Sequence, residues 1–232
     1  MALIAASVVR RRLGPERPLS SLIDFCEAMT VAEDQADLPA LGEFVRRLGD
    51  DDGVHASSGA VAGLVVALAA DLAAQVASAS PDWTERRGAL AQAEVIRDRA
   101  IQLAAEVEQS YGAAMVALDR ALAGSGMGSG STHERDATLG DTLTGLLDRL
   151  LRIGEVASDA GQLGALAATS GTMGLRANAV SATMLASAAA EIVAHLVEIN
   201  LLVRSDDERL RRAGELAAAA AASRDRAQSF GR

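Results

Sequence analysis

The sequence predicts an all-α protein, an antiparallel bundle of long alanine-rich helices. Of its 232 residues 50% are hydrophobic but only 2% are aromatic, so small and aliphatic side chains on closely spaced elements must fill the core. Apolar residues recur at helical spacing over long stretches, and no convincing strand of alternating polarity lies between them. Helices with such small side chains pack closely in bundles.

Two stretches, 59–79 and 177–203, are the most apolar parts of the chain. Each is long enough to resemble a membrane span, but Asp71 and Gln75 lie inside the first, and alanine contributes little to insertion. We therefore expect two buried helices rather than membrane spans. Four polar residues should mark one edge of the second helix, namely Glu191, His195, Glu198 and Asn200.

The middle of the chain is expected to hold two very long elements. Residues 84–123, rich in Ala, Leu, Glu and Arg, favour one long helix or two collinear helices. Four glycines and three serines in 124–131 end it, and they favour a connecting loop over a lid. Residues 136–168 carry leucines on one stripe and should form a helix that ends at Ser170 and Gly171.

The C-terminal part is expected to add two more helices. One starts near Met173 and includes the apolar stretch 177–203. The other covers 206–228, with Ser205 as its N-cap and three acidic residues in its first turn.

The length fits one large domain. Two short amphipathic helices, 19–29 and 38–48, precede the long ones, so we divide the chain into an N-terminal extension, 1–37, and a helical domain, 38–232. The surplus of long apolar helices suggests a homodimer, although a bundle of this size can also bury them alone.

Charge and cysteine usage narrow the function classes. A formal net charge of −9 argues against nucleic acid or an anionic membrane as the main partner. The sequence contains no lysine, which excludes a lysine nucleophile. Cys26 is the only cysteine, and the apolar residues of 1–12 precede the arginines, the reverse of a secretory signal, so we expect a cytoplasmic protein. The Ala, Gly and Arg usage suggests a GC-rich bacterial genome.

A turn of small residues opens the first long helix at Ser57, Ser58, Gly59 and Ala60. Such a turn lets an anion or a developing oxyanion approach the backbone N–H groups of the helix start. The other interpretation is a close helix crossing that only small side chains permit, and the spacing favours it.

Three segments, in order, resemble the cyclodeaminase/cyclohydrolase family of folate enzymes, which includes the cyclodeaminase half of formiminotransferase-cyclodeaminase and methenyltetrahydrofolate cyclohydrolases. In the first, an amphipathic helix at 41–48 leads into 56–64, where the small-residue turn takes the place of the family's Gly-Gly-Gly-Ser turn. In the second, 104–111, Tyr111 matches a family aromatic, and Val107 stands where the family has an acid. Glu106 and Glu108 flank Val107 but point about 100° away around the helix.

The third segment, 176–200, is similar to a family Ser-Asp motif that opens a helix ending in an Asn-rich stretch. Asn178 then takes the place of the family aspartate and Ala177 that of the serine. An asparagine can orient a substrate but cannot act as a general base near neutral pH. Both family positions therefore lack their carboxylate.

The resemblance implies an enzyme acting on a C–N bond of a one-carbon tetrahydrofolate derivative or a related cyclic substrate, without a cofactor. It places Ser57, Ser58, Gly59, Ala60 and Tyr111 around the substrate and Asn178 in the chemistry. By their own chemistry, Arg176 could bind a folate glutamate tail, and His55 could serve as the acid or base that the missing carboxylates no longer provide. Two alternatives stay open: a diverged relative recruited for ring closure or opening in a specialised bacterial pathway, and a catalytically silent subunit that binds a ligand or a partner.

Each of these side chains also has a structural interpretation. Asn178 could cap its helix, Arg176 could be solvated rather than bind a glutamate tail, and His55 could be an exposed loop residue. Tyr111, like Trp83, could stack on a ring or simply pack in the core.

Histidine spacing gives no sign of a metal site, because His55, His133 and His195 have no partner at a ligand spacing. For His195 the sequence favours a structural hydrogen bond with Glu191, one turn earlier on the same helix.

Overall fold

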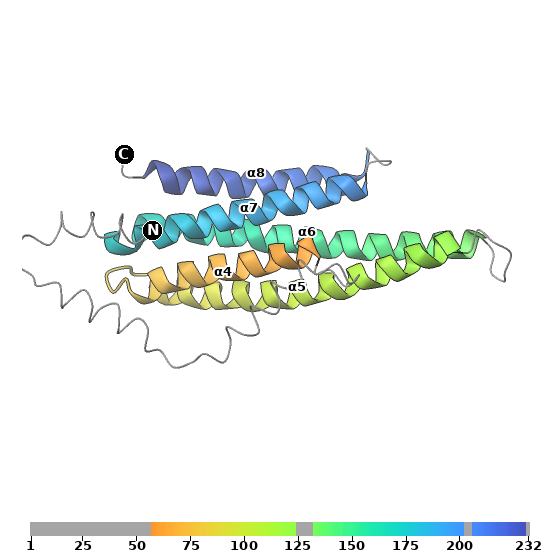
Figure 1. Ribbon diagram of the computed structural model, residues 1–232. Helices are drawn as coiled ribbons and strands as arrows, with labels where there is room; N and C mark the ends of the chain where they lie inside the picture. Colours follow the sequence, from red (N-terminus) through yellow and green to blue (C-terminus); the bar gives the residue numbers. More distant parts are fainter. Residues whose placement is uncertain (1–56, 124–131, 202–205, 231–232) are drawn as a thin grey trace, which may run out of the picture. The chain divides into compact units, whose positions relative to one another are not determined.

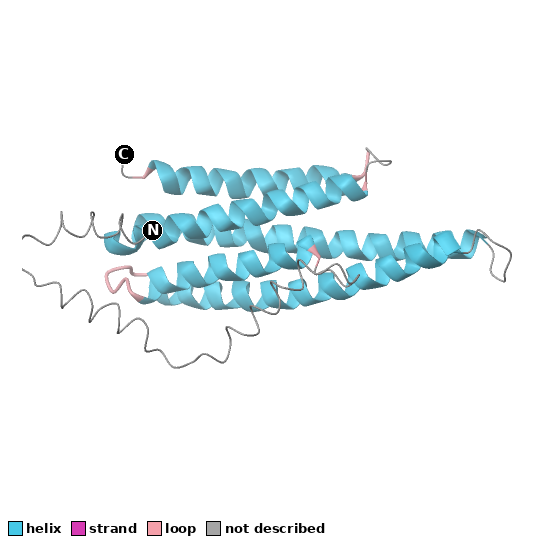
Figure 2. Ribbon diagram, in the orientation of Figure 1, coloured by secondary structure: helices cyan, strands magenta, loops and turns pink. Residues whose placement is uncertain are grey.

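The computed structural model describes residues 57–123, 132–201 and 206–230, and helices account for nearly all of these ranges (Figures 1 and 2). In chain order the elements are α4 (Ser58–Ser78), α5 (Arg86–Ala123), α6 (Thr132–Ser170), a 3-10 turn η1 (Met173–Leu175), α7 (Arg176–Asn200) and α8 (Glu208–Ser229). No strand occurs in the described ranges, so the all-α prediction is confirmed. The expected helices at 19–29 and 38–48, the loop 124–131 and His55 lie outside these ranges.

The predicted helices match the observed ones closely. The expected range 84–123 holds one helix rather than two, which starts at Arg86. Helix α6 ends at Ser170 as expected but begins four residues earlier than the leucine stripe suggested. The N-cap of α8 is a correction: Asp207, not Ser205, caps the helix, and its carboxylate accepts from the backbone N–H of Arg209 at 3.0 Å. Helix α8 therefore starts at Glu208, and Asp206 lies before it.

Helix α6 is the centre of the bundle, because it packs against each of the other four helices. Helices α4 and α7 pack side by side against α6; α5 flanks α4, and α8 flanks α7 (Figure 1). Helices α4 and α7 run antiparallel, so the start of α4 lies beside the end of α7. The core between them consists mainly of alanine, valine and leucine.

Two glycines allow α4 to pack unusually close to its neighbours. A Cβ atom on Gly63 would lie 2.8 Å from Ala104 Cβ and 3.1 Å from the carbonyl oxygen of Ala100, both on α5. A Cβ atom on Gly59 would lie 2.7 Å from Val107 Cγ1 and 2.6 Å from Leu150 Cδ2. The small-residue start of α4 therefore serves a close helix crossing, the interpretation that the spacing favoured.

By length and composition, α4 and the segment Met173–Asn200 are apolar enough to cross a membrane. Inside this bundle, however, 56% of the most apolar window of α4 is buried, and 44% of that of the second segment. The four polar residues expected to mark one edge of α7, Glu191, His195, Glu198 and Asn200, are all exposed. Glu191, His195 and Glu198 share one edge, whereas Asn200 lies about 180° from Glu191 around the helix.

A buried serine ties the end of α4 to the turn before α7. Ser80 is 1% exposed; its hydroxyl donates to the carbonyl oxygen of Val76 at 2.6 Å and accepts from the backbone N–H of Thr172 at 2.8 Å. The Thr172 hydroxyl donates in turn to the carbonyl oxygen of Ala79. These bonds join two chain segments more than 90 residues apart.

We expect Ser80→Ala to lower the free energy of unfolding by about 1 to 2 kcal/mol, because it leaves the Thr172 N–H without its acceptor in a partly buried place. Urea denaturation measures this change. Ser78→Ala, at an exposed position in the same turn, is the matched control and should stay within about 0.5 kcal/mol of wild type. If Ser80→Ala and Ser78→Ala unfold at the same urea concentration, Ser80 does not have this role.

Candidate functional site

The residues that the sequence singled out fall into two groups at opposite ends of α4. Ser57 and Ser58 lie at its start, whereas Asn178, in the first turn of α7, lies beside Gln75 near its end. The two places are about 25 Å apart along the axis of α4, from its rise per residue. One copy of the chain therefore does not bring Asn178 and the small-residue turn into one site.

The start of α4 carries a carboxylate that the sequence analysis set aside. Ser57 caps the helix, and its hydroxyl accepts from the backbone N–H of Ala60 at 3.2 Å. The backbone N–H of Ser57 donates to Oε2 of Glu108 at 2.8 Å. A carboxylate is favoured at this end of a helix, where the backbone dipoles leave partial positive charge.

Val107 and Glu108 both lie at the start of α4, but only Glu108 provides a polar group there. Val107, which the resemblance aligns with a family acid, is fully buried against Gly59, and the carboxylate of Glu108 beside it accepts from the N–H of Ser57. The acid is thus displaced by one residue. Glu106 points elsewhere, toward the guanidinium groups of Arg149 and Arg152 on α6, at 3.9 and 3.6 Å.

Two residues of the predicted turn, Gly59 and Ala60, serve packing, whereas Ser58 is exposed. Gly59 and Ala60 are buried between α4 and its neighbours. Tyr111 is partly buried and packs against the core, one turn beyond Glu108 on α5. Trp83 is also in the core, 4% exposed, with its indole N–H buried and without a hydrogen-bond partner.

At the other end of α4, the capping interpretation of Asn178 is wrong. Leu175 is the N-cap of α7 and makes no side-chain cap, while the Asn178 amide donates to Oε1 of Gln75 at 3.2 Å. Arg176 donates to the carbonyl oxygen of Ala227 at 3.0 Å and so ties α7 to α8, rather than extending into solvent.

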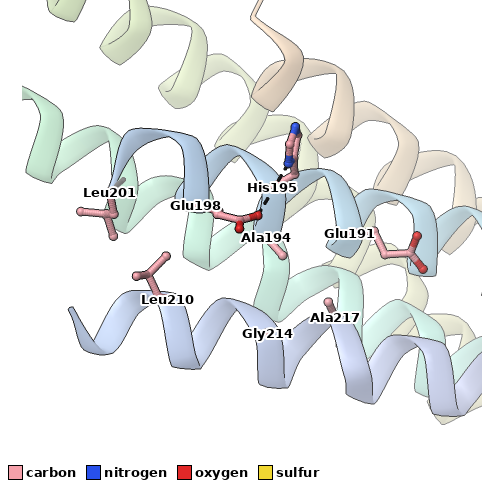
Figure 3. Close-up of a pocket in the computed structure, with 8 residues that line it drawn as sticks. All are labelled: Glu191, Ala194, His195, Glu198, Leu201, Leu210, Gly214 and Ala217. Atoms are coloured by element: carbon pink, nitrogen blue, oxygen red, sulfur yellow. Dashed lines mark ion pairs between the residues drawn. The ribbon is translucent and has the colours of Figure 1, made fainter. Parts of the chain in front are cut away.

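His195 is the functional candidate that sequence reasoning missed. The expected hydrogen bond with Glu191 is wrong: Glu191 accepts from the Ser187 hydroxyl at 3.0 Å and pairs with Arg224. The Nδ1 atom of His195 instead lies 3.8 Å from Oε2 of Glu198, and its side chain is 69% exposed (Figure 3). Glu198 could have indicated this pair from the sequence, because it lies three residues after His195 and therefore on the same helix face. Glu191, four residues before His195, lies on that face too, and the sequence alone did not choose between them.

Two open grooves meet at His195. We call the first the α4–α7 groove; it has a volume of about 360 Å³ and is lined by Ser58, Val61, Ile192, His195 and Leu196. The second, the α7–α8 groove, has a volume of about 580 Å³ (Figure 3). Its lining combines carboxylates with small and aliphatic side chains: Glu191, Ala194, His195, Glu198, Leu201, Leu210, Gly214 and Ala217.

The α4–α7 groove joins three features that suit acid–base chemistry on an organic substrate. Its walls are mainly aliphatic, Ser58 provides a hydroxyl, and His195 provides an imidazole with a carboxylate beside it. Imidazole is a side chain that enzymes commonly use for proton transfer, and here the Glu198 carboxylate lies 3.8 Å from it. Among the described residues, no three His, Cys, Asp or Glu side chains are grouped to hold a metal ion.

Comparison with known proteins agrees with this architecture. No curated protein matches the chain. A crystal structure of formiminotetrahydrofolate cyclodeaminase from Thermotoga maritima is similar with a TM-score of 0.69 at 21% identity, over 81% of this chain and 93% of the other. At that identity the likeness shows the fold. The family model for formiminotransferase-cyclodeaminase matches residues 40–219, which cover α4 to α7 and much of α8. The chain thus belongs to the formiminotransferase-cyclodeaminase family.

Proposed function

We propose that this protein is an enzyme that makes or breaks a C–N bond of a one-carbon tetrahydrofolate derivative, with the reaction taking place in the α4–α7 groove. Membership of the family supports the reaction class. The observation that carries the proposal is His195, an accessible imidazole paired with Glu198 and adjacent to Ser58 at the start of α4.

The reaction requires a group that moves a proton. The resemblance aligns Val107 and Asn178 with the two family carboxylates, and neither side chain can act as a general base. In a cyclodeaminase step, N10 of the folate attacks the carbon of the protonated formimidoyl group on N5, and ammonia leaves. His195 would take the proton from N10 as the new C–N bond forms and return it to the departing nitrogen. The aliphatic walls of the groove suit the flat pterin ring.

Glu108 is the second candidate for the chemistry, because its carboxylate lies at the start of α4, where the family motif would bring an acid. Its hydrogen bond with the Ser57 N–H holds the carboxylate in one place. We assign it a positioning role, holding the helix start and thereby Ser58 at the edge of the groove.

The remaining parts of the proposal follow from the sequence. The protein acts in the cytoplasm and uses no cofactor besides its folate substrate. Arg176 lies toward the other end of α4 and donates to the carbonyl oxygen of Ala227, and its contact with the glutamate tail of a folate stays a prediction.

The purified full chain tests the proposal. It is incubated separately with 5-formiminotetrahydrofolate and 5,10-methenyltetrahydrofolate, while methenyl absorbance, ammonia release and the thermal shift are recorded. We expect turnover above the buffer rate with at least one of them.

Binding without turnover would overturn the enzymatic proposal. The protein would then be a silent or recruited relative, as the missing family carboxylates suggest. Neither binding nor turnover would overturn the folate substrate class as well.

A further inference from the structure

The α7–α8 groove carries fixed charge of one sign. Its volume is about 580 Å³, and two carboxylates, Glu191 and Glu198, line it from one face of α7. No arginine of the described ranges lines the groove, although arginine is the only basic residue besides histidine in this sequence. The groove therefore repels an anion, such as the glutamate tail of a folate, and attracts a cation.

Each carboxylate has an oxygen atom to offer a ligand. Glu191 uses Oε1 to accept from the Ser187 hydroxyl at 3.0 Å and to pair with Arg224 at 3.4 Å. Glu198 uses Oε2, which lies 3.8 Å from Nδ1 of His195. Oε2 of Glu191 and Oε1 of Glu198 take no part in these contacts. The two side chains are 57% and 67% exposed, so a cation in the groove can reach them.

The rest of the lining is aliphatic and small. Leu201, at the end of α7, and Leu210, in the first turn of α8, lie together at one end of the groove (Figure 3). Ala194, Gly214 and Ala217 have no bulk to fill its middle. Such a lining offers apolar contact to an aliphatic chain. A ligand that matches both the carboxylates and this lining is an alkylammonium ion.

We propose that the α7–α8 groove binds an aliphatic primary amine as its ammonium ion, and that this amine is the leaving group of the C–N bond reaction. The binding site rests on the groove alone, whereas the role of the amine as leaving group rests on the proposed function. The substrate is then a folate whose formimidoyl nitrogen carries an alkyl chain.

His195 connects the two grooves, because it lines both. N10 of a folate in the α4–α7 groove attacks the carbon of the protonated N-alkylformimidoyl group, and the new C–N10 bond forms. The proton of N10 passes through His195 to the outer nitrogen, the bond from the carbon to that nitrogen breaks, and a neutral alkylamine leaves. The amine then takes up a proton from water, as a lysine side chain does at neutral pH, and stays beside the carboxylates.

The size of the groove favours an alkylamine over ammonia alone. Ammonia is about as large as a water molecule, whose share of the liquid volume is about 30 Å³. The groove has a volume of about 580 Å³, and ammonia has no apolar part for Leu201 and Leu210 to contact. An alkyl chain on the leaving nitrogen occupies this space.

A substitution that fills the groove tests the amine site without any assay of activity. Gly214 is exposed on α8, and nothing lies within 4 Å of a Cβ atom added there, so Gly214→Leu should fold and extend into the groove. Calorimetric titration of the full chain with n-butylammonium chloride measures the affinity. We expect Gly214→Leu to weaken binding at least tenfold. Gly112→Leu, at an equally open position on α5, is the matched control and should bind as the wild type does.

The charge of the ligand is tested in the same titration. Glu191→Gln and Glu198→Gln should each weaken n-butylammonium binding about two- to fivefold, the usual effect of an exposed ion pair. Neutral n-butanol should bind the wild type more weakly than n-butylammonium does. If the wild type does not bind n-butylammonium, or if Gly214→Leu binds it as tightly as Gly112→Leu does, the amine site is overturned.

The reverse reaction tests the leaving group. The chain is incubated with 5,10-methenyltetrahydrofolate and either n-butylamine or ammonia, and mass spectrometry measures the formimidoyl products. Both products should form faster than in buffer, and Gly214→Leu should lower the ratio of butyl product to ammonia product at least tenfold. If the wild type uses ammonia but not n-butylamine, the alkylamine leaving group is overturned. If it acts on no folate, the proposed function fails, while the titration still decides the amine site.

Discussion

Gly63→Ala is expected to lower the free energy of unfolding by about 1 to 3 kcal/mol, the usual range for overpacking a core. The added Cβ atom would lie 2.8 Å from Ala104 Cβ and 3.1 Å from a backbone oxygen of α5. Neither neighbour is the end of a flexible side chain, so α4 and α5 must move apart. Urea denaturation of the two proteins measures the difference.

Gly112→Ala is the matched control, because it makes the same chemical change in an open place. Nothing lies within 4 Å of a Cβ atom at Gly112, which is exposed on α5. Alanine there should raise the free energy of unfolding by roughly 0.5 to 1 kcal/mol through its higher helix propensity. A stabilised Gly63→Ala protein would show that the crossing of α4 and α5 is looser than described.

His195→Ala should lower the turnover number with the folate substrate by about 100-fold or more, the usual contribution of a general acid–base group. The side chain is 69% exposed, so the free energy of unfolding should hardly change. Steady-state kinetics and a thermal melt of the same preparation separate the two effects. Added imidazole should restore part of the turnover of the alanine variant, which a merely structural role would not allow.

Asp119→Asn, an exposed change on α5 outside both grooves, is the control for His195→Ala and should keep wild-type kinetics. Full turnover in His195→Ala would remove His195 from the mechanism. Glu108 would then be the remaining acid at the start of α4.

The helices could be predicted because their signals are local. Apolar spacing in the chain indicated α4, α6 and α7, and the long run rich in Ala, Leu, Glu and Arg, interrupted only by Gly88 and Gly112, indicated α5. The spacing of the small residues also favoured the close crossing at Gly59 and Gly63, because small side chains on one helix face allow a second helix to approach closely. The boundary at 37 and 38, which divides extension from domain, stays a prediction.

Helix ends were harder to predict, because neighbouring residues compete for the same position. Ser205 and Asp207 can both cap a helix, and Asp207 does so here while also pairing with Arg209. Asn178 is a good cap by residue type, but α7 continues from the 3-10 turn, and the Asn178 side chain bonds to Gln75 instead.

The amino-acid sequence by itself determined the family, the helical class and the small-residue packing of α4, because helical periodicity and residue volume act over a few turns. Only the tertiary structure decided which polar groups meet. It brought the Glu108 carboxylate to the N–H of Ser57 at the start of α4, paired His195 with Glu198, and separated Asn178 from Ser58. These outcomes depend on the antiparallel order and offset of helices far apart in the chain, which no local pattern encodes.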